Sequence, residues 1–181
     1  MGWPTLQTER LVLRPLVADD LDALADLHAQ EAFWRYPFGR AWSRDETQAF
    51  LERTVQRYTD PGVAVSAVVL RATGDLAGWA GLSVPGFLPE ILPAVEVGWR
   101  LGERFWGQGY ATEAGAAWVR HGFEELALTE ILSIYEPDNI ASGSVMRRLG
   151  FTLHQVTTHP VLGVPLHVRS LTRSSWRDGG Q

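Results

Sequence analysis

Two adjoining segments decide the fold: Val95-Glu96-Val97-Gly98-Trp99-Arg100-Leu101, and then Gly102-Glu103-Arg104-Phe105-Trp106-Gly107-Gln108-Gly109-Tyr110-Ala111-Thr112-Glu113-Ala114. The first segment alternates and is rich in Val and Trp, which predicts a strand. The second segment passes through two glycines and then opens a helix. A strand, a glycine loop and a helix N-terminus together form an anion site from backbone N–H groups and the helix dipole.

The glycine loop does not fit two common nucleotide-binding patterns. A P-loop requires a Lys after its last glycine, and this chain contains no Lys, since all sixteen basic residues are Arg. A dinucleotide fingerprint requires a third glycine at position 112, where this chain has Thr112. Taken alone, Gly107 and Gly109 are equally consistent with a turn that binds nothing.

Further motifs place the loop in a family. They are Glu96–Leu101, Trp106–Ala114, Asp138–Ser142 and Met146–Phe151, in this order along the chain. Together they resemble the GNAT acetyltransferases, and within them the RimJ/RimL-like branch that acetylates the N-termini of ribosomal proteins. The resemblance extends over residues 6–172.

The resemblance implies that the glycine loop holds the pyrophosphate of acetyl-CoA, which is then the co-substrate. In the family the loop follows the pattern Q/R-x-x-G-x-G/A. Gly109 and Ala111 match it, whereas Trp106 stands where Gln or Arg is usual. The expected acetyl-CoA contacts are Val97, Gly98, Trp99, Trp106, Gly107, Gln108, Gly109, Tyr110, Ala111, Thr112 and Asn139.

The predicted fold is α/β with a mixed sheet. The pattern predicts strands at 8–14, 63–71, 76–84, 95–101, 130–135, 151–157 and 164–172, with helices between most of them. The resemblance implies a GNAT fold, a mostly antiparallel sheet that splays between the fourth and fifth strands. Acetyl-CoA would lie in that opening, with its pantetheine along the strand edge. We expect one domain over residues 1–181, with a flexible tail from 174.

Acetyl transfer to an amine needs a base, an oxyanion donor and a partner for the leaving thiolate. Glu96 is the candidate base, and the alternative is an exposed or internally bonded strand carboxylate; Glu90 is the reserve candidate. By resemblance, the N–H of Val97 or Gly98 is the oxyanion donor. Many GNAT enzymes place a Tyr acid where this chain has Met146, so Ser142 is the candidate acid.

Two segments have alternative interpretations. The aromatic segment 33–42 covers one end of the core or forms a wall of the acceptor pocket. The segment 85–93, with three prolines among large apolar residues, packs on its own domain, forms a subunit contact or covers the acceptor site. A homodimer therefore remains one possibility, and neither shape follows from the sequence.

Composition limits the remaining classes. The chain has no Cys, and its five His show no metal-ligand spacing, so we expect no metal site. A net charge of −5 argues against nucleic acid as the partner. The first residues lack a signal sequence, and the longest apolar run is too short to span a bilayer, so we expect a cytoplasmic protein without a membrane partner.

The sequence therefore predicts an N-acetyltransferase that uses acetyl-CoA and acts on a primary amine. The branch resemblance favours a protein or peptide N-terminus as the acceptor. Two alternatives stay open: an enzyme for small amines, and an acyl-CoA-binding module without transfer activity. The presence of Glu96, Asn139 and Ser142 together favours an enzyme.

Overall fold

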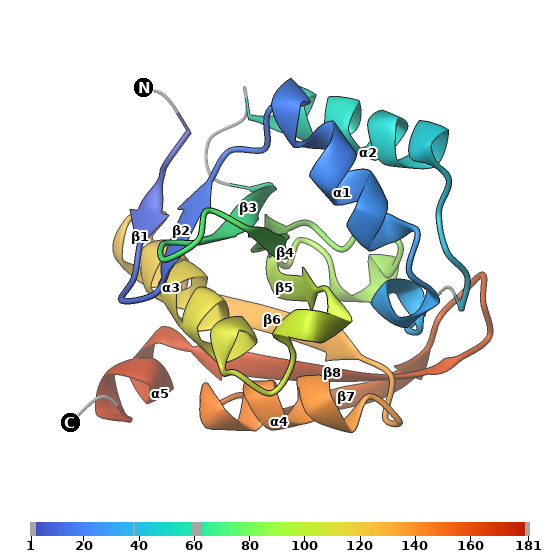
Figure 1. Ribbon diagram of the computed structural model, residues 1–181. Coiled ribbons are helices and arrows are strands. Elements are labelled where there is room, and N and C mark those ends of the chain that lie inside the picture. Colours follow the sequence, from blue (N-terminus) through green and yellow to red (C-terminus); the bar gives the residue numbers. More distant parts are fainter. Residues whose placement is uncertain (1–2, 38, 59–62, 180–181) are drawn as a thin grey trace.

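The computed structural model describes residues 3–37, 39–58 and 63–179, which form one sheet of eight strands flanked by helices (Figure 1). The spatial order is β1-β2-β3-β4-β5-β6-β8-β7, and only β5 and β6 run parallel. The strands are β1 Leu6–Gln7, β2 Leu11–Arg14, β3 Val65–Leu70, β4 Leu76–Ser83, β5 Glu96–Leu101, β6 Glu130–Tyr135, β7 Thr152–Thr158 and β8 Pro165–Thr172. The predicted α/β fold with a mostly antiparallel sheet is confirmed.

Five α-helices and four 3-10 helices are present in the described ranges. The α-helices are α1 Leu21–His28, α2 Arg44–Arg57, α3 Tyr110–Glu124, α4 Ile140–Arg148 and α5 Arg173–Asp178. The 3-10 helices are η1 Ala18–Asp20, η2 Glu31–Trp34, η3 Pro89–Ile91 and η4 Glu103–Phe105. Within these ranges, none of the helices has both the length and the apolar character needed to cross a bilayer.

The helices cover the two faces of the sheet separately (Figure 1). On one face, Trp79 of β4 packs against Phe50 of α2, with ring centroids 5.8 Å apart. On the other face, Trp99 of β5 lies against Gly115 of α3, where a Cβ atom would come within 3.2 Å of the indole. A larger residue than Gly115 would push α3 away from the sheet. We call these surfaces the α2 face and the α3 face.

The parallel strands β5 and β6 touch only at their beginning. The N–H of Leu132 donates to the carbonyl of Val95 at 2.9 Å, and Glu96 opposite Leu132 is the one register pair. One step further, the hydroxyl of Ser133 donates to the Val97 carbonyl at 2.8 Å in place of a main-chain bond. From there the strands separate, which is the expected opening.

Two predicted boundaries are wrong. Of the strand expected over 8–14, only Leu11–Arg14 is formed, as β2, and it pairs with the short strand β1 that precedes position 8. Between them the Thr8 hydroxyl accepts from the Leu11 N–H at 3.0 Å and turns the chain. The tail expected from 174 instead forms α5 in its described part. The Thr172 hydroxyl caps that helix by accepting from the Ser175 N–H, and Trp176 packs against Phe123. Residues 180 and 181 lie outside the described ranges.

The two ambiguous segments both contribute to the core. Phe33 and Trp34 are buried, and Trp42 stacks on Trp34 at 3.7 Å, so these rings cover one end of the core; Phe38 lies outside the described residues. In segment 85–93, Leu88 is fully buried and packs with Leu132, Leu166 and Val168. That segment therefore packs on its own domain.

Candidate active site

A cavity of about 680 Å³ opens where β5 and β6 diverge. Its walls are η2 with the residues after it, the end of β5, the glycine loop with the start of α3, and the turn into α4. The expected acetyl-CoA contacts that line it are Trp99, Trp106, Gly107, Gly109, Tyr110, Ala111, Thr112 and Asn139, and the candidate acid Ser142 lines it too. Val97, Gly98, Gln108 and Glu96 are not part of this lining.

The glycine loop has a backbone that only glycine adopts without strain. Gly107 and Gly109 have φ angles of +72° and +82°, and Gly109 is the N-cap of α3. The loop therefore enters α3 with its first N–H groups free of helical partners. Trp106, which stands where Gln or Arg is usual, has a structural role in this chain. Its indole N–H donates to the Leu101 carbonyl at 2.7 Å and ties the loop to β5.

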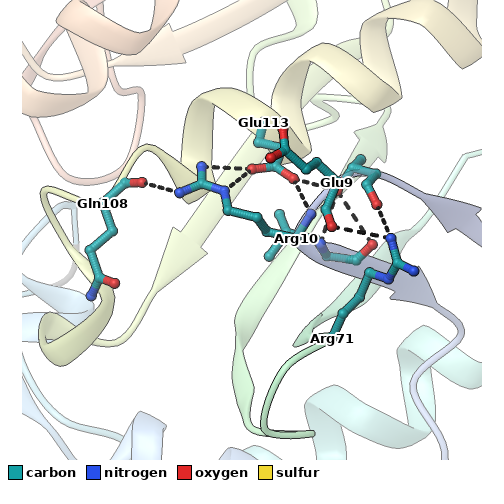
Figure 2. A network of polar contacts seen from close by, with 7 residues as sticks. Glu9, Arg10, Arg71, Gln108 and Glu113 are labelled. Carbon is teal, nitrogen blue, oxygen red and sulfur yellow. Dashed lines mark hydrogen bonds and ion pairs between the residues drawn. The ribbon is translucent and has the colours of Figure 1, made fainter.

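A polar network outside the predicted site holds this loop (Figure 2). Arg10 donates to the Gln108 carbonyl at 2.9 Å and to the Glu113 carboxylate through Nε at 2.7 Å. Glu113 also accepts from the Thr8 hydroxyl at 2.6 Å and the Arg10 backbone N–H at 2.8 Å. Burial alone would raise the pKa of Glu113, but these hydrogen bonds outweigh it and lower that pKa. The turn between β1 and β2 thus fixes the carbonyl of Gln108 within the loop.

The start of α4 forms the opposite wall. The Asn139 side chain accepts from the Ser142 N–H at 3.1 Å, so Asn139 is the helix N-cap. Within the described residues, the Ser142 hydroxyl itself has no hydrogen-bond partner, whereas the Ser144 hydroxyl donates to the Ile140 carbonyl. Met146, at 1% exposure, belongs to the core. Of these two serines, Ser142 is therefore the one whose hydroxyl is free to bind a ligand in the cavity.

Glu96 stands at the point where β5 and β6 part. Its carboxylate accepts a hydrogen bond from the Ser83 hydroxyl at 3.0 Å. Burial raises the pKa of Glu96 to about 7, and the Ser83 hydrogen bond opposes this rise. Although the residue keeps some accessible surface, its carboxyl changes protonation close to neutral pH. A carboxyl with that property can take a proton from an amine and release it again.

Glu96, Gly98 and Arg100 share the α2 face of β5, because side chains alternate along a strand. Glu96 and Arg100 are opposite Ser83 and Trp79 of β4 on that face. A Cβ atom built at Gly98 would meet nothing within 4 Å, so the space above Gly98 is open. Glu96 at one end and Arg100 at the other therefore border this open strip above Gly98, with their Cα atoms about 13 Å apart.

The Arg100 guanidinium is buried among aromatic rings. It donates to the Phe33 carbonyl at 2.6 Å and lies over the rings of Trp34 and Trp79. Burial lowers the pKa of Arg100 to about 10, an effect that the charge of Glu136 opposes. Nearby, burial also lowers the pKa of His28 to about 3, so that imidazole is neutral near pH 7. Arg100 lines the cavity from the α2 face.

Of the residues expected from the sequence, the glycine loop, Asn139 and Ser142 line the cavity, whereas Glu96 lies outside its lining where β5 and β6 part. The residues absent from the predicted site are Arg100 in the cavity lining and Thr8, Arg10 and Glu113 in the network that holds the loop. Tyr36, in the aromatic segment 33–42, and Asp138 also line the cavity. Arg100 could have been noticed, because a basic residue inside an otherwise apolar strand is unusual. Arg10 and Glu113 lie 103 positions apart, and no local pattern joins them.

Comparison with known proteins supplies the family. Residues 10–152 match the family described as "Acetyltransferase (GNAT) domain". This chain belongs to the GNAT acetyltransferases. It is 33% identical to the FsC-acetyl coenzyme A-N(2)-transacetylase of Aspergillus fumigatus, over 96% of this chain and 78% of that protein. It is accordingly an acetyl-CoA-dependent acyltransferase.

Solved GNAT structures share the fold. An acetyltransferase from Agrobacterium tumefaciens str. C58 superposes with a TM-score of 0.78 at 28% identity, and the match covers 96% of each chain. The ribosomal L7/L12 alpha-N-protein acetyltransferase RimL, solved in complex with coenzyme A, gives a TM-score of 0.78 at 18% identity. That match covers 95% of this chain and 99% of RimL. Among the described residues, no group of three or more His, Asp or Glu could hold a metal ion.

Proposed function

We propose that this GNAT acetyltransferase transfers the acetyl group of acetyl-CoA to the amino terminus of a protein or peptide, with Glu96 as the general base. The observation that carries the proposal is the Glu96 carboxyl, whose pKa of about 7 and position beside the open strip above Gly98 suit proton transfer. In the reaction the amine nitrogen bonds to the acetyl carbon, the carbon–sulfur bond breaks, and the amine proton finally replaces the lost bond on sulfur.

Residues in the cavity lining and beside it on β5 divide this work. The N–H groups at the start of α3 would hold the pyrophosphate, and the unpaired edge of β5 would hold the pantetheine. Glu96 takes the proton that an ammonium must lose before it can attack. The N–H of Val97 or Gly98 would stabilise the negative charge that develops on the carbonyl oxygen. Ser142, whose hydroxyl is uncommitted, would donate to the leaving sulfur.

A small-molecule amine is the second candidate acceptor. It is favoured by the name of the Aspergillus relative, which refers to transfer onto an N(2) nitrogen. The binding module without transfer activity is set aside, because the chain belongs to a family of acetyl-CoA-dependent acyltransferases. The first two candidates differ only in the class of acceptor.

The test is a thiol-release assay with acetyl-CoA and a panel of acceptors. Peptides with free N-termini should be acetylated with a kcat/KM at least about tenfold above polyamines and aminoglycosides, which corresponds to about 1.4 kcal/mol. Preferential turnover of the small amines would replace the peptide by the second candidate. Coenzyme A binding without thiol release from any acceptor in the panel would mean that the acceptor belongs to neither class.

A further inference from the structure

Two charged side chains near the cavity each hold a buried polar atom without a partner. Among the described residues, Nε of Arg100 and Oε1 of Glu136 are shielded from solvent and make no hydrogen bond. An unsatisfied buried polar atom destabilises a fold by about 1–3 kcal/mol, and more when the group is charged. Because the fold keeps two such atoms at one place, both are available to bind a ligand.

The two groups lie on either side of the separation between β5 and β6. Arg100 is near the end of β5, and Glu136 directly follows β6. The guanidinium and the carboxylate are not within ion-pair distance of each other in the described residues. Burial and the neighbouring Asp138 charge raise the pKa of Glu136, while the Arg100 charge lowers it, so the opposite charges sense each other across a gap.

The free atoms differ in hydrogen-bond character, and this selects the chemistry of a ligand. Nε of Arg100 can only donate, and the ionised carboxylate of Glu136 can only accept. An ammonium group could satisfy Glu136 but would be repelled by Arg100, and a carboxylate would have the reverse problem. A trans amide carries its C=O and N–H on opposite sides, so a single amide between the two groups can satisfy both.

We propose that Arg100 and Glu136 form an amide-recognition subsite for the acceptor, binding the C=O and N–H of its first peptide bond. The proposal rests on the proposed function, and it explains why the acceptor would be a peptide and not a simple amine. Arg100 lies on the same face as Glu96, separated from it by the open strip above Gly98. The amine and the first amide of a peptide are only about 3.5 Å apart, so an acceptor whose first amide lies at Arg100 reaches Glu96 through bridging water.

The shielded side of the subsite fits this role. Arg100 is held by the Phe33 carbonyl and by the rings of Trp34 and Trp79, so its Nε has a fixed direction. The Tyr36 hydroxyl donates to the Asp138 carbonyl at 3.1 Å, which joins the segment after η2 to the turn that follows Glu136. This link borders the cavity. Low solvent access strengthens each charge-assisted hydrogen bond that an acceptor amide would make.

The experiment compares trialanine with trialanine whose first peptide bond is an ester, in wild type and in Glu136→Ala. The ester lacks the N–H, so wild type should use it with an acceptor kcat/KM reduced at least about tenfold. In Glu136→Ala the two acceptors should be used equally, and the KM for acetyl-CoA should stay within about twofold of wild type. Glu130→Ala, an exposed carboxylate at the other end of β6, is the matched control and should keep the discrimination.

Several results would overturn the subsite. An ester penalty that persists in Glu136→Ala would do so, as would a rise in the KM for acetyl-CoA alone, which would assign the pair to the pantetheine amides. Equal use of propylamine and trialanine by wild type would also overturn it while leaving the acetyltransferase activity intact. If no acceptor releases thiol, the proposed function itself fails; calorimetry with N-acetyl-trialanine then decides the subsite, since equal affinity for wild type and Glu136→Ala would refute it.

Discussion

The polar groups around the two ends of the cavity are held in opposite ways. At the glycine-loop end, Arg10 and Glu113 satisfy one another and fix the Gln108 carbonyl (Figure 2). At the other end, Arg100 and Glu136 hold buried atoms without partners, and burial moves the pKa of Glu96 to about 7. A saturated network, in which every polar group has a hydrogen-bond partner, gives a fixed shape for a co-substrate that is always the same. An unsaturated region, in which polar groups lack partners, keeps these groups available for the acceptor and for proton transfer.

The largest effect is expected where the unsaturated end does chemistry. Glu96→Gln keeps the size of the side chain but removes the base, and should lower kcat about 10²–10⁴-fold at neutral pH. In wild type, kcat should rise with pH through about 7, because the ionised carboxylate is the active form. The variant should lack this rise and recover partly at higher pH, where more amine is already deprotonated.

Initial rates from pH 5.5 to 9 at saturating acetyl-CoA measure this profile. Ser83→Ala is a useful companion, because the Ser83 hydrogen bond stabilises the ionised form of Glu96 and its loss should move the inflection upward. Full activity of Glu96→Gln with an unchanged profile would exclude Glu96 as the base. The exposed Glu90 would then be the next carboxylate to test.

The saturated end should respond through cofactor affinity. Gly109→Asp places a β-carbon at a φ of +82° and a negative charge where phosphate is expected, so calorimetry should show at least about a tenfold loss of coenzyme A affinity. Gly109→Asn is the matched control, since Asn has the same shape, tolerates positive φ and carries no charge. It should lose clearly less. Unchanged affinity in a folded Gly109→Asp would remove the loop from the phosphate site.

The sequence predicts those parts of this contrast that depend on residues close together in the chain. The glycine loop, the Asn139 cap and the strand with Glu96 are local patterns, and each was placed correctly along the chain. The fold followed from the order of these motifs. Their closeness around one opening came from the family resemblance, because no spacing in the sequence shows that β5 and β6 separate.

Most of the missed features are long-range. The Thr8 turn is partly local, because the Thr8 hydroxyl accepts from the Leu11 N–H three residues on, but the Glu113 partner that gives the turn its role lies in α3. The pKa of Glu96 depends on the protein packed around its carboxyl, which only the folded chain has. The unpartnered state of Arg100 and Glu136 is likewise a property of what surrounds them, and composition carries no trace of it.

Ser142 tests whether an uncommitted hydroxyl matters at the leaving group. Ser142→Ala should lower kcat about tenfold, less than the base does, because a thiolate leaves readily without a full proton. Affinity for coenzyme A should change little. Ser144→Ala on the same helix is the control, since its hydroxyl already donates to the Ile140 carbonyl. Equal rates for Ser142→Ala and wild type in single-turnover experiments would leave the thiolate without a side-chain donor.

The smallest expected effect is a change in coenzyme A affinity when the Arg10–Glu113 network is altered. The direction of this change distinguishes two roles of Glu113. Glu113→Gln removes a negative charge near the expected pyrophosphate, so electrostatics alone would raise coenzyme A affinity. If Glu113 instead positions the loop through Arg10, affinity should fall. Because the Arg10 side chain is 44% exposed, the pair is worth no more than about 1 kcal/mol, which predicts about a twofold to fivefold loss.

The control for charge is Glu103→Gln. Glu103 is an exposed acid at the start of η4, and it forms no ion pair within the described residues. This variant removes the same charge close to the same loop without touching the Arg10 network, so its affinity should stay equal or rise slightly. Amide hydrogen exchange of residues 107–111 should become faster in Glu113→Gln and not in Glu103→Gln. A higher coenzyme A affinity in Glu113→Gln would mean that the network only carries charge and that the glycine loop holds its shape without it.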